Sequence, residues 1–495
     1  MRNTNLGGAV SPDEGAVLID LSTPSPTVLT FAQFDTAASA LAAQLHHDYP
    51  AGARIGILGE NSARWATLFY AVMRAGLVAV PISYRQPPHM VSFVVADAEL
   101  AAVYVGDEYT NLLEPGTSAV VHRLEDVDIT ASSARFVADV DPEQPAMFLY
   151  TSGSTGKPKG VVLSHRSHLW VVGLGIESAS AQARLMLSAP LYHMGALSPL
   201  QRALGAGQSV VLLPRFDSHR VLRAIEEHSV TDLNVVPPMA ALLMKEAEAL
   251  AVTDVSSVRT IILNSAPASL ELLAELDRVF REPRFVFTYG TTESSPIAFT
   301  APSDGRRVPF GSLGVPHPAV EIRLVDAAGK HVERDGVLQI RSPGLMSGYH
   351  RRPEIPSPIT SDGYYHTKDL FQRDDEGFYY CLGREDDMFI CGGENIYPRA
   401  VELALENHPA VSQAVVVPVD DAVKGQKPVA FVTLLPGRQV SEQELRSYSL
   451  TRLEPVAHPR RIWFLEALPL AATNKIDRAL LNRQAAERFS GPTQP

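Results

Sequence analysis

The sequence has only two cysteines, Cys381 and Cys391, among its 495 residues. Two thiols cannot build a disulfide framework or a four-thiolate metal site, so the chain suits a reducing compartment. Basic residues are also in deficit, because 43 lysines and arginines face 55 aspartates and glutamates, for a net charge of −12. A general nucleic-acid binder shows the opposite balance, so that class is excluded.

Long apolar runs are missing as well. The longest apolar stretch, 65–82, is broken by Arg74 and Gly76 and is too short to span a bilayer comfortably. The first fifteen residues lack the apolar core of a signal peptide, so we expect a soluble, cytoplasmic protein without a membrane span. A composition of 45% hydrophobic and 20% charged residues is typical of globular proteins. The length predicts more than one domain.

Short apolar runs alternate with helical patterns through the first 300 residues. Such alternation predicts an α/β fold with mainly parallel sheets that helices cover on both faces. The predicted strands are 55–58, 77–82, 146–150, 209–213, 232–236, 260–263 and 285–287, and the predicted helices are 63–74, 218–228, 238–249 and 270–280.

The pattern changes near residue 320, where four short strands follow one another without helices. They are predicted at 321–325, 337–341, 364–367 and 378–382, and they indicate a small β subdomain at about 315–384. A compact α+β unit of ordinary domain size follows, with a helix at 398–407 and strands at 413–417 and 429–434. We therefore expect an N-terminal domain over 1–384 and a C-terminal domain over 385–495.

The strongest local signal is the stretch Tyr150-Thr-Ser-Gly-Ser-Thr-Gly-Lys-Pro-Lys-Gly160. Glycines and small hydroxyl residues let backbone N–H groups approach an anion closely, and lysines add ammonium donors. The alternative is a surface turn rich in serine and glycine. The stretch is not a Walker A motif, because Pro158 follows Lys157 where that motif has Ser or Thr for magnesium. Lysine is scarce, with eight in the whole chain, so two in this loop favour a phosphate site.

Five further segments complete an ordered series: Tyr289-Gly-Thr-Thr-Glu-Ser294, His366-Thr-Lys-Asp-Leu370, Gly383-Arg-Glu-Asp386, Cys391-Gly-Gly-Glu-Asn-Ile-Tyr-Pro398 and Thr473-Asn-Lys-Ile476. Together with the loop, the series resembles the ANL superfamily of adenylate-forming enzymes (acyl-CoA synthetases, peptide-synthetase adenylation domains and luciferases). It is most similar to freestanding acyl-CoA synthetases. The resemblance implies the ANL fold, in which a small α+β C-terminal domain moves as a lid over a large N-terminal domain.

The resemblance also implies a site for ATP and AMP. Tyr289 can lie along the purine, and Asp369 can accept hydrogen bonds from two ribose hydroxyls. Arg384 either completes this ribose clamp or pairs with Asp386 or Asp387. Glu293 and Thr155 are the expected Mg²⁺ ligands. The other residues expected at the nucleotide are Thr151, Ser152, Gly153, Ser154, Gly156, Lys157, Ala266, Pro267, Gly290, Thr291 and Thr292.

The family reaction has two steps, in which a carboxylic acid is converted to acyl-AMP and a thiol then displaces AMP. The residues expected to act are Lys475, Thr155, Glu293 and His193. Lys475 would neutralise charge at the α-phosphate, although a single lysine is by default a solvated cap, here before a helix at 476–486. Asp386 matches the hinge of the lid, and Gly392, Gly393 and Glu394 match the loop on the CoA side.

Candidate residues of the acyl pocket are Tyr192, His193, Met194, Val236, Asn264 and Ser265. His193 either gates this pocket or is a structural histidine. The substrate is expected to be an aryl, medium-chain or bulky alicyclic acid, because the segment Cys391–Pro398 resembles the version found in CoA ligases for such acids. Val236 stands where amino-acid-activating relatives keep an acidic residue, which disfavours an amino acid.

Four positions depart from the usual pattern of the superfamily. Phe287 replaces an Asn, Lys368 replaces a Gly before the ribose Asp, and Asn474 replaces a Gly before the catalytic Lys. Asn264-Ser-Ala-Pro267 replaces Gly-Gly-Ala-Pro.

The leading hypothesis is an acid–CoA ligase that uses ATP, Mg²⁺ and CoA and that could form a homodimer. The first alternatives are an enzyme that performs mainly the step from acyl-AMP to acyl-CoA and a ligase that loads an acyl carrier protein. A third alternative, from another class, is a non-catalytic nucleotide-binding homologue.

Overall fold

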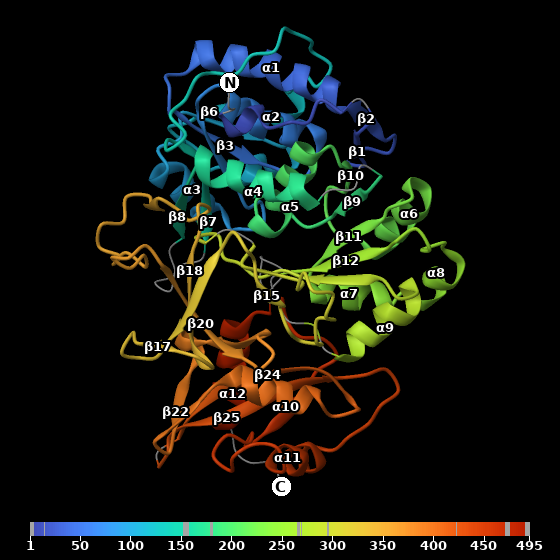
Figure 1. The fold of residues 1–495 in the computed structure, drawn as a ribbon, viewed down its shortest axis with the longest axis vertical. Helices are drawn as coiled ribbons and strands as arrows, with labels where there is room; N and C mark the ends of the chain where they lie inside the picture. The colour runs from blue at the N-terminus through green and yellow to red at the C-terminus, as the bar shows by residue number, and fades with distance from the viewer. Residues whose placement is uncertain are drawn as a thin grey trace.

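The computed structural model describes residues 4–13, 15–151, 158–178, 182–264, 268, 270–294, 297–421, 423–470 and 476–490. The N-terminal part contains two seven-stranded sheets and an antiparallel five-stranded sheet, and a further five-stranded sheet forms the smaller C-terminal domain. In Figure 1 the first two sheets extend from the top to the right-hand middle, where β11 and β12 lie, the antiparallel sheet lies at the left of the middle, and the C-terminal domain lies at the bottom. This arrangement confirms the predicted fold class.

The first seven-stranded sheet is parallel apart from its last pair, β1 with β2. Its order is β13 (Arg284–Phe287), β12 (Thr260–Leu263), β11 (Asp232–Val235), β9 (Arg184–Leu187), β10 (Ser209–Leu212), β1 (Val17–Asp20) and β2 (Thr27–Thr30). The helices α6 (Ser218–His228), α7 (Pro237–Met244), α8 (Ala247–Val252) and α9 (Leu270–Phe280) belong to the same part of the chain.

One helix prediction in this region was wrong. The predicted helix 238–249 is two helices, α7 and α8. The break follows from the last turn of α7, where Lys245 and Glu246 donate to the carbonyls of Leu242 and Leu243 at 3.2 Å each, three residues back. Such a tightened turn ends an α-helix.

The second seven-stranded sheet has parallel strands at its centre and an antiparallel hairpin, β7 with β8, at one side. Its order is β19 (Gly348–Tyr349), β8 (Lys159–Ser164), β7 (Pro145–Thr151), β4 (Val78–Ile82), β3 (Arg54–Leu58), β5 (Ala102–Val105) and β6 (Val120–Arg123). The remaining N-terminal helices are α1 (Phe31–Asp48), α2 (Ala63–Arg74), α3 (Pro88–Asp97), α4 (His165–Ser178) and α5 (Met194–Ala206), with short 3₁₀ turns at Leu6–Gly8, Asp107–Leu112 and Leu124–Asp126.

Helix α2 joins the two sheets into one core, because it packs on β1 of the first sheet and on β3 and β4 of the second. Its last residue, Arg74, is fully buried and is held by Asp35 at 2.8 Å, by the hydroxyl of Ser39 at 2.7 Å and by the carbonyl of Gly7 at 2.9 Å. A Cβ on Gly7 would lie 2.3 Å from the backbone nitrogen of Arg74. The N-terminal segment therefore packs against the core through the buried Arg74–Asp35 ion pair and the close approach of the Gly7 backbone to that of Arg74.

The five-stranded antiparallel sheet matches the predicted β subdomain. Its order is β17 (His331–Val332), β16 (Glu321–Val325), β18 (Asp335–Arg341), β20 (Tyr365–Arg373) and β21 (Tyr379–Arg384), and a separate pair is formed by β14 (Phe299–Thr300) and β15 (Val315–Pro316). Strand β20 bulges, because Val337 and Gln339 of β18 pair with Leu370 and His366. Three residues of β20 thus stand opposite one residue of β18.

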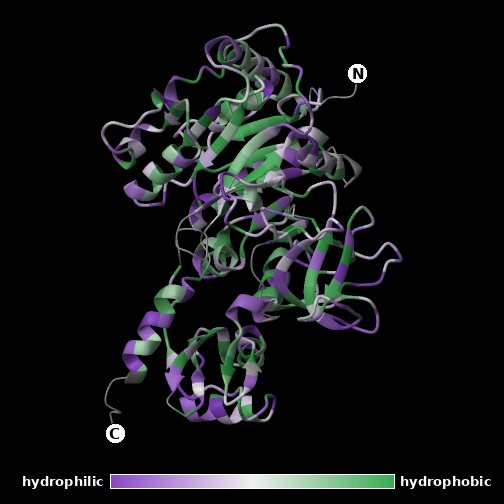
Figure 2. Cartoon of the chain, turned by 90° about the vertical axis from the view of Figure 1, so that its left-hand side faces the viewer, coloured by the Kyte–Doolittle hydropathy of each residue, from purple (hydrophilic) through white to green (hydrophobic). Residues whose placement is uncertain are grey.

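A 3₁₀ turn, η4 (Glu385–Asp387), leads from this sheet into the C-terminal domain. That domain contains β22 (Phe389–Cys391), β23 (Glu394–Ile396), β24 (Val411–Asp421), β25 (Gly425–Leu434), β26 (Ile462–Phe464), α10 (Pro398–Glu406), α11 (Glu442–Leu450) and α12 (Arg478–Ser490). Figure 2 shows that hydrophobic residues follow the strands of each sheet. Helices long and apolar enough to cross a membrane do not occur among the described residues.

Candidate active site

The two ends of the phosphate-type signature lie on the antiparallel strands β7 and β8, where Thr151 is paired opposite Lys159. The expected ligands Ser152, Gly153, Ser154, Thr155, Gly156 and Lys157 lie outside the described residues. The hydroxyl oxygen of Thr151 is buried and finds no hydrogen-bond partner in the described part of the chain. Two flanking antiparallel strands differ from the strand and helix that flank a Walker motif.

The expected metal ligand Glu293 faces the same hairpin. Only 9% of its surface is exposed, and its carboxylate accepts a hydrogen bond of 3.0 Å from the hydroxyl of Tyr349. The ammonium of Lys159 lies 4.4 Å from the centre of the Tyr349 ring. Since β19, which ends at Tyr349, pairs with β8, the sheet brings Tyr349 and its partner Glu293 beside β8.

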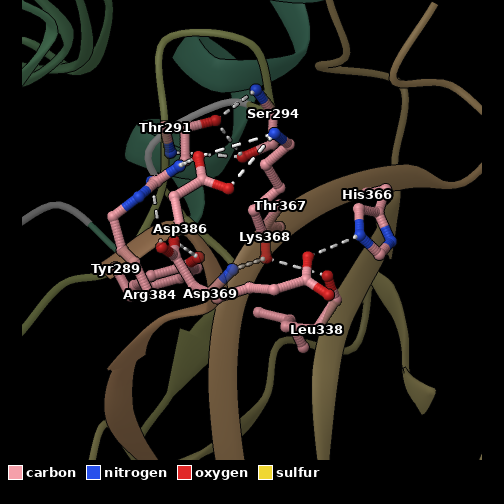
Figure 3. A network of polar contacts seen from close by, with 11 residues as sticks. Tyr289, Thr291, Ser294, Leu338, His366, Thr367, Lys368, Asp369, Arg384 and Asp386 are labelled. Carbon is pink, nitrogen blue, oxygen red and sulfur yellow. Dashed lines mark hydrogen bonds and ion pairs between the residues drawn. The ribbon is translucent and has the colours of Figure 1, made fainter. Parts of the chain in front are cut away.

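The expected ribose acid Asp369 lies at the centre of a second cluster, which Figure 3 shows from close by. Its side chain is 10% exposed, accepts a hydrogen bond from the hydroxyl of Tyr289 and lies 3.1 Å from the guanidinium of Arg384. The Tyr289 ring packs edge-on against Phe299 and Phe371. Burial, together with the charge of Asp369, holds the pKa of Tyr289 well above its ordinary value, so this hydroxyl stays a donor.

The segment 289–293 joins the two clusters, because Tyr289 bonds to Asp369 and Glu293 bonds to Tyr349. Tyr365 is a buried side chain at the start of β20. Burial and then the charges of Glu293 and Asp369 raise the pKa of Tyr365 above its ordinary value. The burial of Cys381, and secondly the charge of Asp369, raise the pKa of that thiol to about 12, which keeps it protonated and unreactive.

Arg384 makes both of the contacts that the sequence left open. It binds Asp369, and its second nitrogen lies 3.4 Å from Asp386 in η4. The ammonium of Lys368 lies 3.2 Å from the same Asp386 carboxylate, as Figure 3 shows. Thr291, in the motif before Glu293, bonds within its own turn to Ser294 at 3.1 Å, while Gly290 is exposed and Thr292 half-buried.

The expected acyl-pocket residues stand at the ends of strands and the starts of helices. His193 occupies the N-cap position of α5 without a side-chain capping hydrogen bond, and the centre of its ring lies 4.5 Å from that of Tyr192. Met194 is the first residue of α5, and Val236 precedes α7. Asn264, which follows β12, donates a hydrogen bond of 2.9 Å to Asn234 on the adjacent strand. Ser265, Ala266 and Pro267 lie outside the described residues.

The CoA-side loop is a tight hairpin in which Gly392 and Gly393 join β22 to β23. Their φ angles of +61° and +92° are those of a two-residue turn that glycine accommodates, and Glu394 beyond it is exposed. Lys475 lies outside the described residues. The base of its loop is closed by the pair Leu470 and Ile476. Helix α12 begins at Arg478, two residues after the predicted start, and Arg478 lies 2.6 Å from the buried Glu402.

Three side chains near the expected site were not found from the sequence: Tyr349, Tyr365 and Asn234. Tyr365 directly precedes the ribose motif, a position that could have drawn attention to it. Tyr349 and Asn234 had no local signal, because only the sheet pairing brings them to Glu293 and Asn264. Among the described residues no group of three His, Cys, Asp or Glu side chains forms a metal cluster.

Comparison with known proteins decides which family shares this arrangement. The profile of the AMP-binding enzyme family matches residues 8–350, and that of the AMP-binding enzyme C-terminal domain matches residues 400–475. The chain belongs to the AMP-binding enzyme family. This adenylate-forming enzyme is thus a member of the ANL superfamily, as the motif series indicated.

Curated relatives of this AMP-binding enzyme are ligases of about its own length. A 2-succinylbenzoate–CoA ligase of Bacillus cereus (strain Q1) is 29% identical over 486 residues, which cover 97% of each chain. A feruloyl-CoA synthase of an Amycolatopsis species is 30% identical over 503 residues, 98% of this chain and 100% of the relative. The fatty acid–[acyl-carrier-protein] ligase ScoC of Streptomyces coeruleorubidus is 30% identical over 467 residues, 89% of this chain and 87% of the relative.

Solved structures agree with the sequence relatives. ATP-bound MatB from Rhodopseudomonas palustris aligns with a TM-score of 0.86 at 26% identity, covering 99% of this chain and 100% of that one. The apo form of the same protein aligns with a TM-score of 0.78 at 25% identity and the same coverage. The o-succinylbenzoate CoA synthetase MenE from Bacillus subtilis, in complex with its acyl-adenylate OSB-AMP, gives 0.80 at 29% identity over 96% of each chain.

Proposed function

We propose that this AMP-binding enzyme converts a free carboxylic acid to its acyl-CoA, with ATP cleaved to AMP and pyrophosphate. The observation that carries the proposal is the position of the segment 289–293, which contacts the ribose motif at one end and the strand after the phosphate-type loop at the other. The hydroxyl of Tyr289 donates to Asp369, and Glu293 accepts from Tyr349, whose ring lies beside Lys159 at the start of β8. Groups suited to the metal, the ribose and the phosphates therefore lie around one place.

The residues present fit a magnesium ion that ATP shares with the protein. Mg²⁺ usually binds through one or two carboxylates plus substrate phosphates and waters, not through an all-protein cage. A single oriented carboxylate, Glu293, matches that requirement, and the Thr151 hydroxyl at the end of β7 has no hydrogen-bond partner among the described residues. Glu293, with Thr155 from the loop, would hold the ion, which supplies charge neutralisation at the phosphates.

The first step forms a bond between a carboxylate oxygen of the acid and the α-phosphorus of ATP, and it breaks the bond from that phosphorus to pyrophosphate. Lys475 neutralises the charge that develops there. In the second step a thiolate attacks the acyl carbonyl, and the carbon–oxygen bond to AMP breaks. Asp369 and Arg384 hold the ribose throughout, because they are fixed to β20 and β21 by strand pairing.

The C-terminal domain, over 385–495, is proposed to alternate between the two steps about Asp386. The higher TM-score against the ATP-bound MatB than against its apo form supports the view that the described arrangement is the adenylate-forming one. In the second arrangement the turn at Gly392 and Gly393 would replace Lys475 at the acyl group.

The acid is proposed to be aryl, medium-chain or bulky alicyclic. The similarity to ligases named for 2-succinylbenzoate and ferulate supports an aromatic acid. Tyr192, Met194 and Val236 supply apolar surface, and the Asn264–Asn234 pair places a polar amide beside it. His193, at the N-terminus of α5, is proposed to gate this pocket.

A mass-spectrometric assay tests the proposal. The chain is incubated with ATP, Mg²⁺ and a panel of aryl, fatty and polycyclic acids, with CoA, with a carrier protein bearing phosphopantetheine, or with neither. Acyl-AMP without a thiol, and acyl-CoA with CoA, are expected for one class of acid. Transfer only to the carrier protein would favour the alternative that the similarity to ScoC supports.

The same assay separates the remaining alternatives. Conversion of supplied acyl-AMP without formation of acyl-AMP would indicate the half-reaction enzyme, and no product with any acid would indicate a non-catalytic homologue. The homodimer stays a prediction, which light scattering checks.

A further inference from the structure

Lys368 has a backbone conformation that a side chain disfavours. Its φ is +63°, in the left-handed region, where a Cβ crowds the neighbouring carbonyl oxygen. The other described non-glycine residues with positive φ lie in turns and bends, whereas Lys368 lies within strand β20. Glycine meets this φ without strain, which gives a physical reason for the Gly that the superfamily usually has before the ribose acid.

The strain is part of the bulge that places the ribose clamp. Residues 367–369 form the stretch of β20 that stands opposite one residue of β18. Bulges re-aim side chains beside active sites, and here Thr367 accepts a hydrogen bond of 3.0 Å from the Asp369 backbone. Asp369 thereby turns toward Tyr289 and Arg384, while Lys368 points out of the sheet toward η4 (Figure 3).

Lys368 makes a specific contact from this conformation. Its ammonium lies 3.2 Å and 3.5 Å from the two carboxylate oxygens of Asp386. Asp386 belongs to the turn through which the chain leaves β21 for the C-terminal domain, and Arg384 reaches it from the other side at 3.4 Å. Two cations fixed to the antiparallel sheet thus hold one carboxylate of the connecting segment.

We propose that Lys368 is a positioning residue, which pairs with Asp386 to hold the connecting segment in the adenylate-forming arrangement and thereby sets the relative rates of the two half-reactions. The proposal rests on the proposed function. A strained residue persists where the surrounding structure compensates for it, and the contact with Asp386 gives Lys368 a role that glycine cannot fill.

The substitution Lys368→Gln tests this role, because it removes the charge and keeps a β-carbon at the strained position. The readout is the rate of thioester formation from supplied acyl-AMP divided by the rate of acyl-AMP formation. We expect this ratio to rise roughly two- to fivefold, the range that corresponds to the loss of one exposed ion pair. Raising the salt concentration should increase the ratio more in the wild type than in Lys368→Gln, which keeps only the contact of Arg384 with Asp386.

Arg373→Gln is the matched control. Arg373 ends the same strand and makes an exposed ion pair of 3.4 Å with Glu333, away from η4. Its ratio should equal that of the wild type. When Lys368→Gln is added to Asp386→Asn, the ratio of the two rates should not change further, because the effects of two residues that act through one contact are not additive.

A ratio in Lys368→Gln equal to that of Arg373→Gln overturns the proposal, and so does an equal loss of both rates. Hydrogen exchange of the ligand-free chain keeps the test independent of turnover, since backbone amides in 385–391 should exchange two- to fivefold faster in Lys368→Gln. Unchanged exchange there also overturns it. Absence of acyl-AMP in the wild type, by contrast, would contradict the proposed function and leave the exchange experiment decisive for Lys368.

Discussion

Two buried histidines on α4 make the fold sensitive to acid. His168 is fully buried, and burial lowers the pKa of His168 to about 4 from an ordinary value of 6.5. Its Nδ1 lies 2.8 Å from the side-chain oxygen of Gln201 on α5. His165 is also buried, and burial lowers the pKa of His165 to about 4. Its Nδ1 accepts the backbone N–H of Leu6 at 2.9 Å, which requires the neutral ring.

The sign of the effect follows from proton binding. Between pH 6.5 and pH 4 the unfolded chain binds protons at these rings and the folded chain does not, so stability falls as the pH falls through this window. For a pKa that moves from 6.5 to about 4, one histidine lowers the free energy of unfolding by about 2 kcal/mol between pH 7 and pH 5. The two together lower it by about 4 kcal/mol.

Urea unfolding at pH 7 and pH 5 measures this loss for the wild type and for His168→Gln. Trp65 and Trp170 report on the unfolding by their fluorescence, since they lie in α2 and α4. The variant should lose about 2 kcal/mol less than the wild type between the two pH values, whatever its stability at pH 7. Exposed His89 supplies the control His89→Gln, which should behave like the wild type. An unchanged pH dependence in His168→Gln would refute the reasoning.

Three further predictions concern the site and the core. Tyr349→Phe removes the 3.0 Å hydrogen bond to Glu293 and should raise the Mg²⁺ concentration for half-maximal pyrophosphate release about 10- to 100-fold. The control Tyr364→Phe, which loses a similar bond to the exposed Glu321, should not change this concentration. Equal Mg²⁺ requirements in the two variants would contradict the expected role of Glu293. Asp369→Asn should raise the KM for ATP about 10- to 150-fold, because charge-assisted hydrogen bonds are worth about 1.5–3 kcal/mol, and a normal KM would remove Asp369 from the ribose site. Asp35→Ala leaves the buried Arg74 without its carboxylate partner and should lower the free energy of unfolding in urea by about 3–5 kcal/mol. The control Asp107→Ala, at an exposed pair with Arg123, should leave the unfolding midpoint unchanged. Equal midpoints for the two variants would contradict the account of the core.

Segments with strong local patterns were predictable from the sequence. Strands such as β3 and β12 are short apolar runs, and α6 is a helix with a clear apolar face and Asp217 at its N-cap. Strands β24 and β25 were predicted but too short, since Pro418 within β24 and Gly425 at the start of β25 carry turn signals. Helix α5 was missed because it contains Pro199 and two glycines, and its burial, rather than its propensity, makes it helical.

The candidate site also contains residues that a local pattern predicts and residues that it does not. The motifs named Asp369, Arg384 and Glu293 in advance, because each chemistry needs a definite residue type at a definite place in the series. Tyr349 and Asn234 depend on contacts between strands far apart in the chain, which no local pattern encodes. The departure at Lys368 was visible in the sequence, but its meaning needed the φ angle and the ion pair to Asp386.

The central claim is that the acid attacks the α-phosphorus of ATP and that a thiol then releases AMP. An acid labelled with ¹⁸O at both carboxylate oxygens tests it most directly, with the products read by mass spectrometry. The account predicts one ¹⁸O in AMP and one in the acyl-CoA, because the attacking oxygen stays on phosphorus when the thiolate breaks the carbon–oxygen bond. Label in inorganic phosphate with formation of ADP, or AMP without label, would contradict it.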